Sequence, residues 1–257
     1  MLVLLSPSKT LDETPVTLPI MMGQPDFLDD SALLIEQLRG FSVSELMQLM
    51  GISDKLAELN VARYQSFSAP FHVGNAKAAL FMFKGDVYEP LSLDSYSRED
   101  LDYANAHLRI LSGLYGLLRP LDLMQPYRLE MGTRLKNLRG KDLYAFWGMK
   151  VTQAINDVIT THSSRLVVNL ASQEYFKVVK PAVLSAPLVD ITFLDQKGSA
   201  APKTLGLYAK QARGMMADFI IRQRVDSPEG LKDFSSGNYH FDASRSDAQT
   251  LTFLRHH

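Results

Sequence analysis

Short β-rich runs that alternate with helical segments are the feature that most constrains the fold of this chain. The runs have the length and aliphatic composition of buried strands. These strand candidates are residues 2–5, 166–170, 188–194 and 205–208, and two late runs, 239–241 and 250–254, could close an antiparallel edge. The interleaving predicts an α/β (α+β) fold with a mixed sheet. Because βαβ units do not repeat regularly, we expect an unusual topology.

The helical segments between these runs have recognisable starts. Ser42-Val43-Ser44-Glu45 is a capping box, which predicts a helix over residues 43–50. Ser97-Arg98-Glu99-Asp100 begins a helix that runs to about residue 108. Other expected helices cover residues 28–39, a stretch from Ser53, 76–83, 142–161 and 210–224. No internal repeat or long linker interrupts them, so we expect residues 1–257 to form a single compact domain.

Composition excludes several classes of protein. The chain has no cysteine, which rules out disulfides, thiolate metal sites and cysteine-based peroxide chemistry. The six histidines form no HxxxH or ExxH pair, and GxSxG, GxGxxG and GxxxxGK are absent. No apolar run is long enough to span a bilayer, and the start of the chain does not have a signal-peptide pattern. We therefore expect a cytoplasmic protein with no membrane contact, no metal site and no cofactor.

Charge is unevenly distributed although the formal net charge is only -1. Residues 1–60 carry three bases against nine acids, whereas residues 103–141 carry seven bases against two acids. Residues 203–224 carry five bases against one acid. Two basic blocks in a nearly neutral chain are typical of a local anion-binding face, although solvated surface charge is the simpler alternative.

Residues 109–128 combine glycines with arginines. A helix is expected to enter from Ser97, and Gly113 and Gly116 permit a tight turn. A glycine turn between two short helices resembles a helix-hairpin-helix, whose backbone N–H groups contact DNA phosphates without reading bases. Such hairpins usually have glycines two residues apart, and here they are three apart. A close-packed turn between core elements is the alternative.

Polar loops follow two of the strand candidates. Ser6-Pro7-Ser8-Lys9-Thr10 follows the first strand, and Asn169-Leu170-Ala171-Ser172-Gln173-Glu174-Tyr175 follows a later one. Because ligand sites in α/β proteins lie at the carboxyl ends of strands, these loops could form a cleft for an anion. Lys84-Gly85-Asp86-Val87-Tyr88 brings further polar groups together. Ser172 could equally be a structural helix cap.

Several of these motifs together resemble one known family. They are Ser6-Pro7-Ser8-Lys9-Thr10-Leu11-Asp12, Ile52-Ser53-Asp54-Lys55-Leu56-Ala57, Phe83-Lys84-Gly85-Asp86-Val87-Tyr88, the run from Leu111 to Gly132, Asn169-Leu170-Ala171-Ser172, Glu174-Tyr175-Phe176-Lys177 and Ala212-Arg213-Gly214. The chain resembles, over its whole length, the YaaA family of bacterial peroxide stress resistance proteins. It has Ser8 where the family pattern SPAKT has alanine.

The resemblance implies a stress protein that helps cells survive hydrogen peroxide by limiting damage from free iron. It also implies double-stranded DNA binding, largely without sequence specificity, through a helix-hairpin-helix in an unusual fold with a positively charged cleft. The candidate DNA-binding residues are Arg109, Gly113, Tyr115, Gly116, Arg119, Arg128, Arg134, Lys136, Arg139, Lys141, Lys210 and Arg213. Direct iron binding is not expected, because no ligand cluster is present in the sequence.

The alternative is an enzyme acting on a small anionic or nucleotide-like substrate. Its candidate cleft residues are Lys9, Thr10, Lys84, Asp86, Tyr127, Glu130, Asn169, Ser172 and Glu174. DNA-backbone binding hardly requires the acids among them, since acids repel phosphate. The discriminating observation is whether Lys9, Lys84, Arg128 and Glu174 converge on one pocket or are scattered in separate ion pairs.

Overall fold

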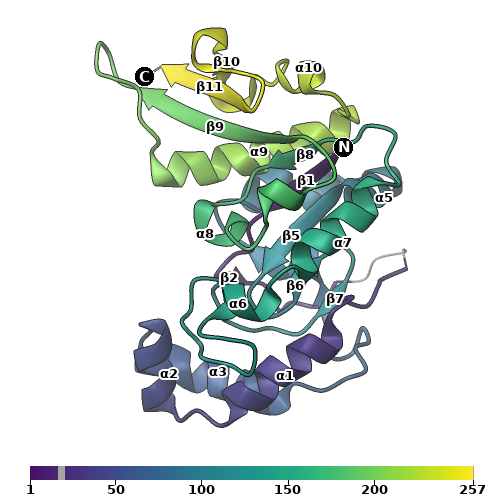
Figure 1. The fold of residues 1–257 in the computed structure, drawn as a ribbon, viewed down its shortest axis with the longest axis vertical. Coiled ribbons are helices and arrows are strands. Elements are labelled where there is room, and N and C mark those ends of the chain that lie inside the picture. The colour runs from purple at the N-terminus through teal and green to yellow at the C-terminus, as the bar shows by residue number, and fades with distance from the viewer. Residues whose placement is uncertain (17–20, 257) are drawn as a thin grey trace.

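A mixed sheet of seven strands runs through the protein, whose computed structural model describes residues 1–16 and 21–256 (Figure 1). The strand order is β10-β11-β9-β8-β1-β5-β6. The strands are β1 (Leu2–Leu5), β5 (Leu108–Ser112), β6 (Gly116–Leu118), β8 (Val167–Asn169), β9 (Leu188–Gln196), β10 (His240–Phe241) and β11 (Thr250–His256). β1 is parallel to both β5 and β8, β9 is parallel to β8 and β11, and the outer strands β6 and β10 are antiparallel. The predicted α/β class and mixed sheet are confirmed.

Two short ribbons fix the chain beside this sheet. β2 (Thr10–Leu11) pairs antiparallel with β4 (Phe83–Lys84), which places Thr10 opposite Lys84. β3 (Lys77–Ala78) pairs with β7 (Leu123–Met124). The polar loop after β1 is therefore held next to the Lys84 segment.

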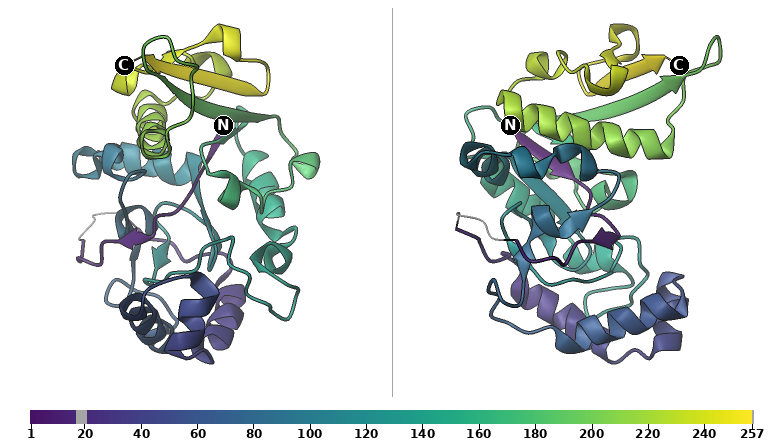
Figure 2. Two further views of the ribbon diagram at one scale, coloured as in Figure 1. Left: turned by 90° about the vertical axis from the view of Figure 1, so that its left-hand side faces the viewer. Right: turned by 180° about the vertical axis from the view of Figure 1, so that it is seen from behind.

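Helices cover the sheet and form a separate layer at one end. α1 (Leu28–Arg39), α2 (Val43–Met50) and α3 (Asp54–Ser66) make up that layer, below the sheet in Figure 1. α5 (Arg98–His107) and α9 (Gly206–Gln223) lie on one face of the sheet and α7 (Lys150–Ile159) on the other (Figure 2). The remaining helices are α4 (Ala79–Met82), α6 (Leu143–Trp147), α8 (Gln173–Phe176) and α10 (Pro228–Leu231). The 3₁₀ turns are η1 (Glu89–Leu91), η2 (Leu93–Ser95), η3 (Pro181–Val183), η4 (Ser236–Asn238) and η5 (Ala243–Arg245). No helix in the described part of the chain is long and apolar enough to cross a membrane.

Several predicted elements have different bounds in the structure. The capping box predicted at Ser42 with Glu45 forms, and the helix predicted to start at Ser97 begins there with a second capping box, made with Asp100. Residues 142–161 are two helices rather than one, because Gly148 adopts a φ of 50° that ends α6. Residues 205–208 are not a strand, since α9 begins at Gly206. The expected helix over 76–83 is reduced to α4 between two short strands.

The expected helix-hairpin-helix around Gly113 and Gly116 is wrong. Helix α5 ends at His107, and Gly113 to Tyr115 form the turn of an antiparallel β-hairpin between β5 and β6. All five residues of β5 are buried, so this segment has no polar side for a surface helix. A Cβ atom at Gly113 would lie 2.2 Å from the Leu129 carbonyl oxygen, so this glycine permits close packing of two backbones.

The sheet reverses its direction of winding between β1 and β8. After β1 the chain continues to β5 on one side, and after β8 it continues to β9 on the other side. Parallel strands that diverge in this way leave a crevice at their carboxyl ends, which is the usual ligand position in open α/β sheets. Ser6 and Ser172 lie just beyond the two strands that flank this crevice.

Candidate functional site

Ser6 and Ser172 join the ends of β1 and β8 directly. The Ser6 hydroxyl oxygen accepts a hydrogen bond from the Ser172 backbone N–H at 2.8 Å, and Ser6 donates to the Ser172 hydroxyl at 3.3 Å. The buried Tyr88 hydroxyl donates to the Ser6 carbonyl at 2.9 Å. Ser172 is the N-cap of α8, but its side chain makes no capping bond to that helix. These bonds fix the polar loop that carries Lys9.

A second buried pair lies at the end of β5. The hydroxyls of Ser112 and Tyr127 are 2.6 Å apart, and Ser112 also accepts the Tyr115 backbone N–H at 2.9 Å. Burial raises the pKa of Tyr127 above its usual range, so the phenol stays protonated. Tyr127 therefore supports the segment that continues to Glu130.

Glu130 brings two cations together. Its two carboxylate oxygens contact Lys9 Nζ at 2.7 Å and Arg128 Nη2 at 3.0 Å. Lys9 is well exposed, whereas Arg128 is largely buried and its Nε has no hydrogen-bond partner among the described residues. The carboxylate thus orients a buried guanidinium and an exposed ammonium at one place.

Glu174 lies close to this group. Its Oε1 accepts the Gly132 backbone N–H at 3.0 Å. Glu130 and Glu174 both line an open cavity of about 450 Å³, which we call the sheet-edge cavity. Its other lining residues are Gln48, Leu49, Met50, Gly132, Thr133 and Arg134. Lys9, Arg128 and Glu174 are therefore connected through Glu130 and this cavity.

The remaining cleft candidates lie in other contacts. Lys84 is 3.7 Å from Asp12 and lines a different cavity, and Asp86 is 3.6 Å from Lys210. Asn169 donates to Asp190 and accepts the Ala171 backbone N–H, so its amide closes the end of β8. Thr10 is exposed on β2 opposite Lys84. The predicted cleft is thus brought together only in part.

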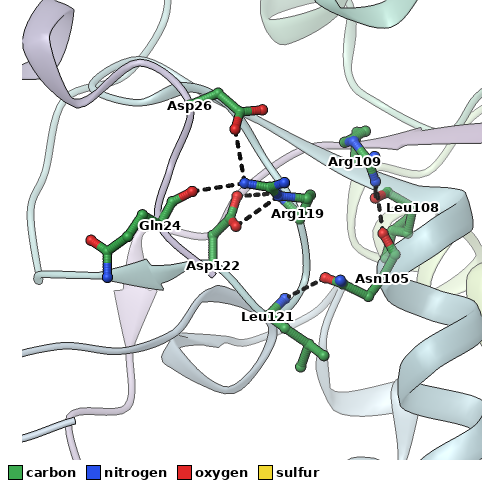
Figure 3. A network of polar contacts seen from close by, with 8 residues as sticks. All are labelled: Gln24, Asp26, Asn105, Leu108, Arg109, Arg119, Leu121 and Asp122. Carbon is green, nitrogen blue, oxygen red and sulfur yellow. Dashed lines mark hydrogen bonds and ion pairs between the residues drawn. The ribbon is translucent and has the colours of Figure 1, made fainter. Parts of the chain in front are cut away.

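Arg119 belongs to a network that fixes the chain between residues 22 and 26 (Figure 3). Its Nε and Nη2 contact Asp122 and Asp26, each at 2.8 Å, and Nη2 donates to the Gln24 carbonyl at 2.7 Å. Asp122 is 1% exposed, and burial raises its pKa to about 6. With three partners, this arginine has a structural role.

Arg109, also drawn in Figure 3, is buried within the sheet. Its Nη1 donates to the carbonyls of Asn105 at 2.9 Å and Leu108 at 2.7 Å. Burial lowers the pKa of Arg109 to about 10. Its guanidinium closes the junction between α5 and β5 and does not reach the surface.

The other DNA-binding candidates divide by exposure. Gly113, Tyr115 and Gly116 are buried in the β5–β6 hairpin. Arg139 pairs with Asp30, and Arg213 is half-buried on α9. Arg134, Lys136 and Lys141 are exposed and form no ion pair with any described residue. Among the candidate DNA-binding cations, these last three, all in one loop, are exposed without an ion pair to any described residue.

Helices α2 and α3 form a glycine-turned pair that sequence reasoning missed. Gly51 has the left-handed φ and ψ of 63° and 41° and ends α2, and Ser53 is the N-cap of α3 without a side-chain capping bond. Ile52 is buried between them, while Gly51 and Ser53 are exposed. The sequence signal for this pair is Gly51 between two expected helices, in a part of the chain that is acidic overall.

No group of three or more His, Asp or Glu side chains that could hold a metal ion occurs within residues 1–16 and 21–256. Compared with known protein families, residues 1–245 match the family model described as peroxide stress protein YaaA. The matched region includes the sheet-edge cavity, the α2–α3 pair and the Arg119 network. Because this match covers nearly the whole chain, the protein belongs to the peroxide stress protein YaaA family.

Proposed function

We propose that this peroxide stress protein binds double-stranded DNA, largely without sequence specificity, and so helps limit iron-dependent oxidative damage. The observation that carries the proposal is the turn Gly51-Ile52-Ser53 between α2 and α3, in which Gly51 and Ser53 are exposed and Ile52 is buried. This turn takes the place of the Gly113–Gly116 segment as the DNA-contacting element. The free backbone N–H groups of α3 and the cations near the turn also support the proposal.

The backbone of the turn suits a phosphate group. The first N–H groups of a helix have no intrahelical partner, and the helix dipole adds partial positive charge there. α3 is 13 residues long, and no side-chain capping bond from Ser53 occupies those groups. A DNA phosphate can therefore accept hydrogen bonds from this end, as anions commonly do at helix N-termini.

Cations next to the turn supply attraction over a longer range. Lys55 is exposed on the first turn of α3. Arg134 lines the sheet-edge cavity together with Gln48, Leu49 and Met50 of α2, and so lies beside the α2–α3 pair. Lys136 is also exposed, and its carbonyl accepts a hydrogen bond from Gln37 of α1, which belongs to the same helical layer as α2 and α3. Glu130 and Glu174 nearby are engaged by Lys9, Arg128 and the Gly132 N–H.

The link to iron follows from counter-ion release. Cationic protein groups bound to phosphates displace the cations condensed on DNA. Ferrous ions are among the cations that phosphates attract, so coverage by this protein lowers the amount of iron at the DNA surface. In a strand-break assay with Fe²⁺ and hydrogen peroxide, we expect the protein to protect duplex DNA. Equal breakage with and without the protein would argue against this link.

The binding itself is tested by titrating a duplex between about 50 and 200 mM salt. We expect affinity to fall steeply, and K55A and R134A each to weaken binding and reduce the salt slope by about 1. R165A removes an exposed arginine elsewhere and serves as the matched control. An affinity that does not change with salt, or equal losses in all three variants, would contradict the proposal.

A second candidate function is an enzyme acting on a small anionic or nucleotide-like substrate in the sheet-edge cavity. The observation that favours it is the Lys9–Glu130–Arg128 group next to the carboxyl ends of β1 and β8. Two carboxylates on one cavity are also suited to acid–base chemistry. We expect AMP to raise the melting temperature of the wild type but not of K9A. DNA affinity separates the two functions, because K9A lies outside the α2–α3 turn.

A further inference from the structure

We propose that a second cavity, around Arg63, binds a small molecule with an anionic head, carboxylate or phosphate, and a short apolar body. It has a volume of about 370 Å³, within the range of ligand sites. We call it the Arg63 cavity. It is separate from the sheet-edge cavity, and the inference does not depend on DNA binding.

Two cations of low exposure give the cavity its positive charge. The side chains of Arg63 and Lys77 are 14% and 11% exposed. Charged groups removed from water to this extent require an anion or hydrogen-bond acceptors nearby. Both obtain their carboxylates from one short segment that follows β2, where Lys77 contacts Asp12 and Arg63 contacts Glu13.

Asp12 is firmly bound. Lys77 Nζ donates to the Asp12 carbonyl at 2.7 Å, and the Asp12 carboxylate accepts the Thr14 backbone N–H at 2.9 Å. The hydrogen bonds with Thr14, together with nearby Lys77, lower the pKa of Asp12 to about 2. Asp12 therefore holds Lys77, which lines the Arg63 cavity, and is not available as an exchangeable partner.

Glu13 is different, because its side chain is 52% exposed and its contact to Arg63 uses a single guanidinium nitrogen, Nη2, at 2.5 Å. Because the carboxylate of this ion pair is half exposed to water, the pair is weak and exchanges readily. Glu13 thus occupies the arginine without using its full hydrogen-bonding capacity.

Arg63 Nε is the unused part. It is buried and has no hydrogen-bond partner in the described part of the chain. A carboxylate or phosphate can bind Nε and Nη2 side by side in the bidentate geometry that arginine favours. A ligand that displaces Glu13 would gain this second hydrogen bond, which Glu13 does not make.

The rest of the lining is hydrogen-bonded to backbone groups and partly apolar. Gln125 exchanges two hydrogen bonds with the Ser68 backbone, and Asn75 bonds the backbone of His72 and Pro70. Met22, Met82 and Val73 supply apolar surface. Such a wall fits an apolar body attached to the anionic head.

Binding is tested with hexanoate and hexyl phosphate as anionic probes and hexanol as the neutral control, by titration calorimetry. We expect at least one anion to bind and hexanol not to bind. R63Q should weaken anion binding roughly tenfold or more, which corresponds to about 1.4 kcal/mol. E13Q should strengthen it, because the internal competitor loses its charge. Binding by one anion but not the other identifies the head group.

A second variant covers the case in which R63Q does not fold. Val73 lines the cavity and is 74% exposed, so V73W can obstruct the cavity without disturbing the core. L138W adds the same side chain at an exposed position outside this cavity. We expect V73W to abolish binding and L138W to leave it unchanged. The proposal would be overturned if both anions failed to bind wild type and E13Q, or if V73W and wild type bound equally well. DNA affinity is measured separately and tests the α2–α3 turn.

Discussion

The hydroxyl oxygen of Ser6 accepts the backbone N–H of Ser172 at 2.8 Å, which ties together two loops 166 residues apart in the chain. The loops follow the two parallel strands at which the sheet changes its direction of winding. This hydrogen bond joins the loops that follow β1 and β8 and so fixes the loop from which Lys9 contacts Glu130. One buried serine therefore fixes the loop whose lysine contacts Glu130 of the sheet-edge cavity.

Replacing Ser6 by alanine should lower the free energy of unfolding by about 1–3 kcal/mol, because the Ser172 N–H loses its acceptor. Urea denaturation of wild type and S6A measures this. S163A, at an exposed serine, is the control and should change stability by less than about 0.5 kcal/mol. Equal stability of S6A and wild type would mean that the bond does not hold the loops.

Two glycines should respond differently to alanine. In G113A the new Cβ would lie 2.2 Å from a backbone oxygen, so we expect a loss of about 3 kcal/mol or more. In G51A the Cβ meets nothing within 4 Å, and only the positive φ is strained, at a cost of about 1 kcal/mol. Thermal unfolding of both variants shows which one is less stable, and we expect that to be G113A. A G113A protein as stable as G51A would contradict the close packing of this turn.

Asp122 should make stability depend on pH in the acidic range. Burial raises its pKa from 3.8 to about 6, so the folded protein binds this proton more tightly than the unfolded chain. Its stabilising contribution is present below pH 3.8 and is lost as pH rises through about 6, by up to about 3 kcal/mol. D122N should remove this decline, measured by urea denaturation from pH 4 to 7. If the difference in the free energy of unfolding between wild type and D122N did not change with pH, the raised pKa of Asp122 would be contradicted.

Local chemistry predicted much of the fold from the sequence. The capping boxes at Ser42 and Ser97 form because their hydrogen bonds involve residues three positions away. The strands at 2–5 and 166–170 were recognisable from aliphatic runs. The strand predicted over residues 205–208 is wrong, because Leu205 is the N-cap of α9 and residues 206–208 are its first helical residues, so the surrounding helix overrides their β-rich composition.

The site was less predictable because its contacts join distant residues. The loops carrying Lys9, Glu130 and Glu174 were identified, but sequence could not show that Glu130 contacts both Lys9 and Arg128. Nor could a charge count show that Arg109 is buried or that Arg119 is held by Asp26 and Asp122. The number of basic residues in 103–141 is therefore larger than the number that present free positive charge at the surface.

The most direct test of the proposed DNA contact is a comparison of two N-cap substitutions. Aspartate is as good an N-cap as serine, so S53D and S97D should both fold. Ser53 begins α3 at the proposed contact, whereas Ser97 begins α5, which is well separated from α3 (Figure 1). The new carboxylate at position 53 occupies the free N–H groups and repels phosphate. Measured by duplex titration at about 50 mM salt, S53D should bind at least tenfold more weakly than wild type while S97D binds equally; unchanged affinity in S53D, or equal weakening in both, would contradict the central claim.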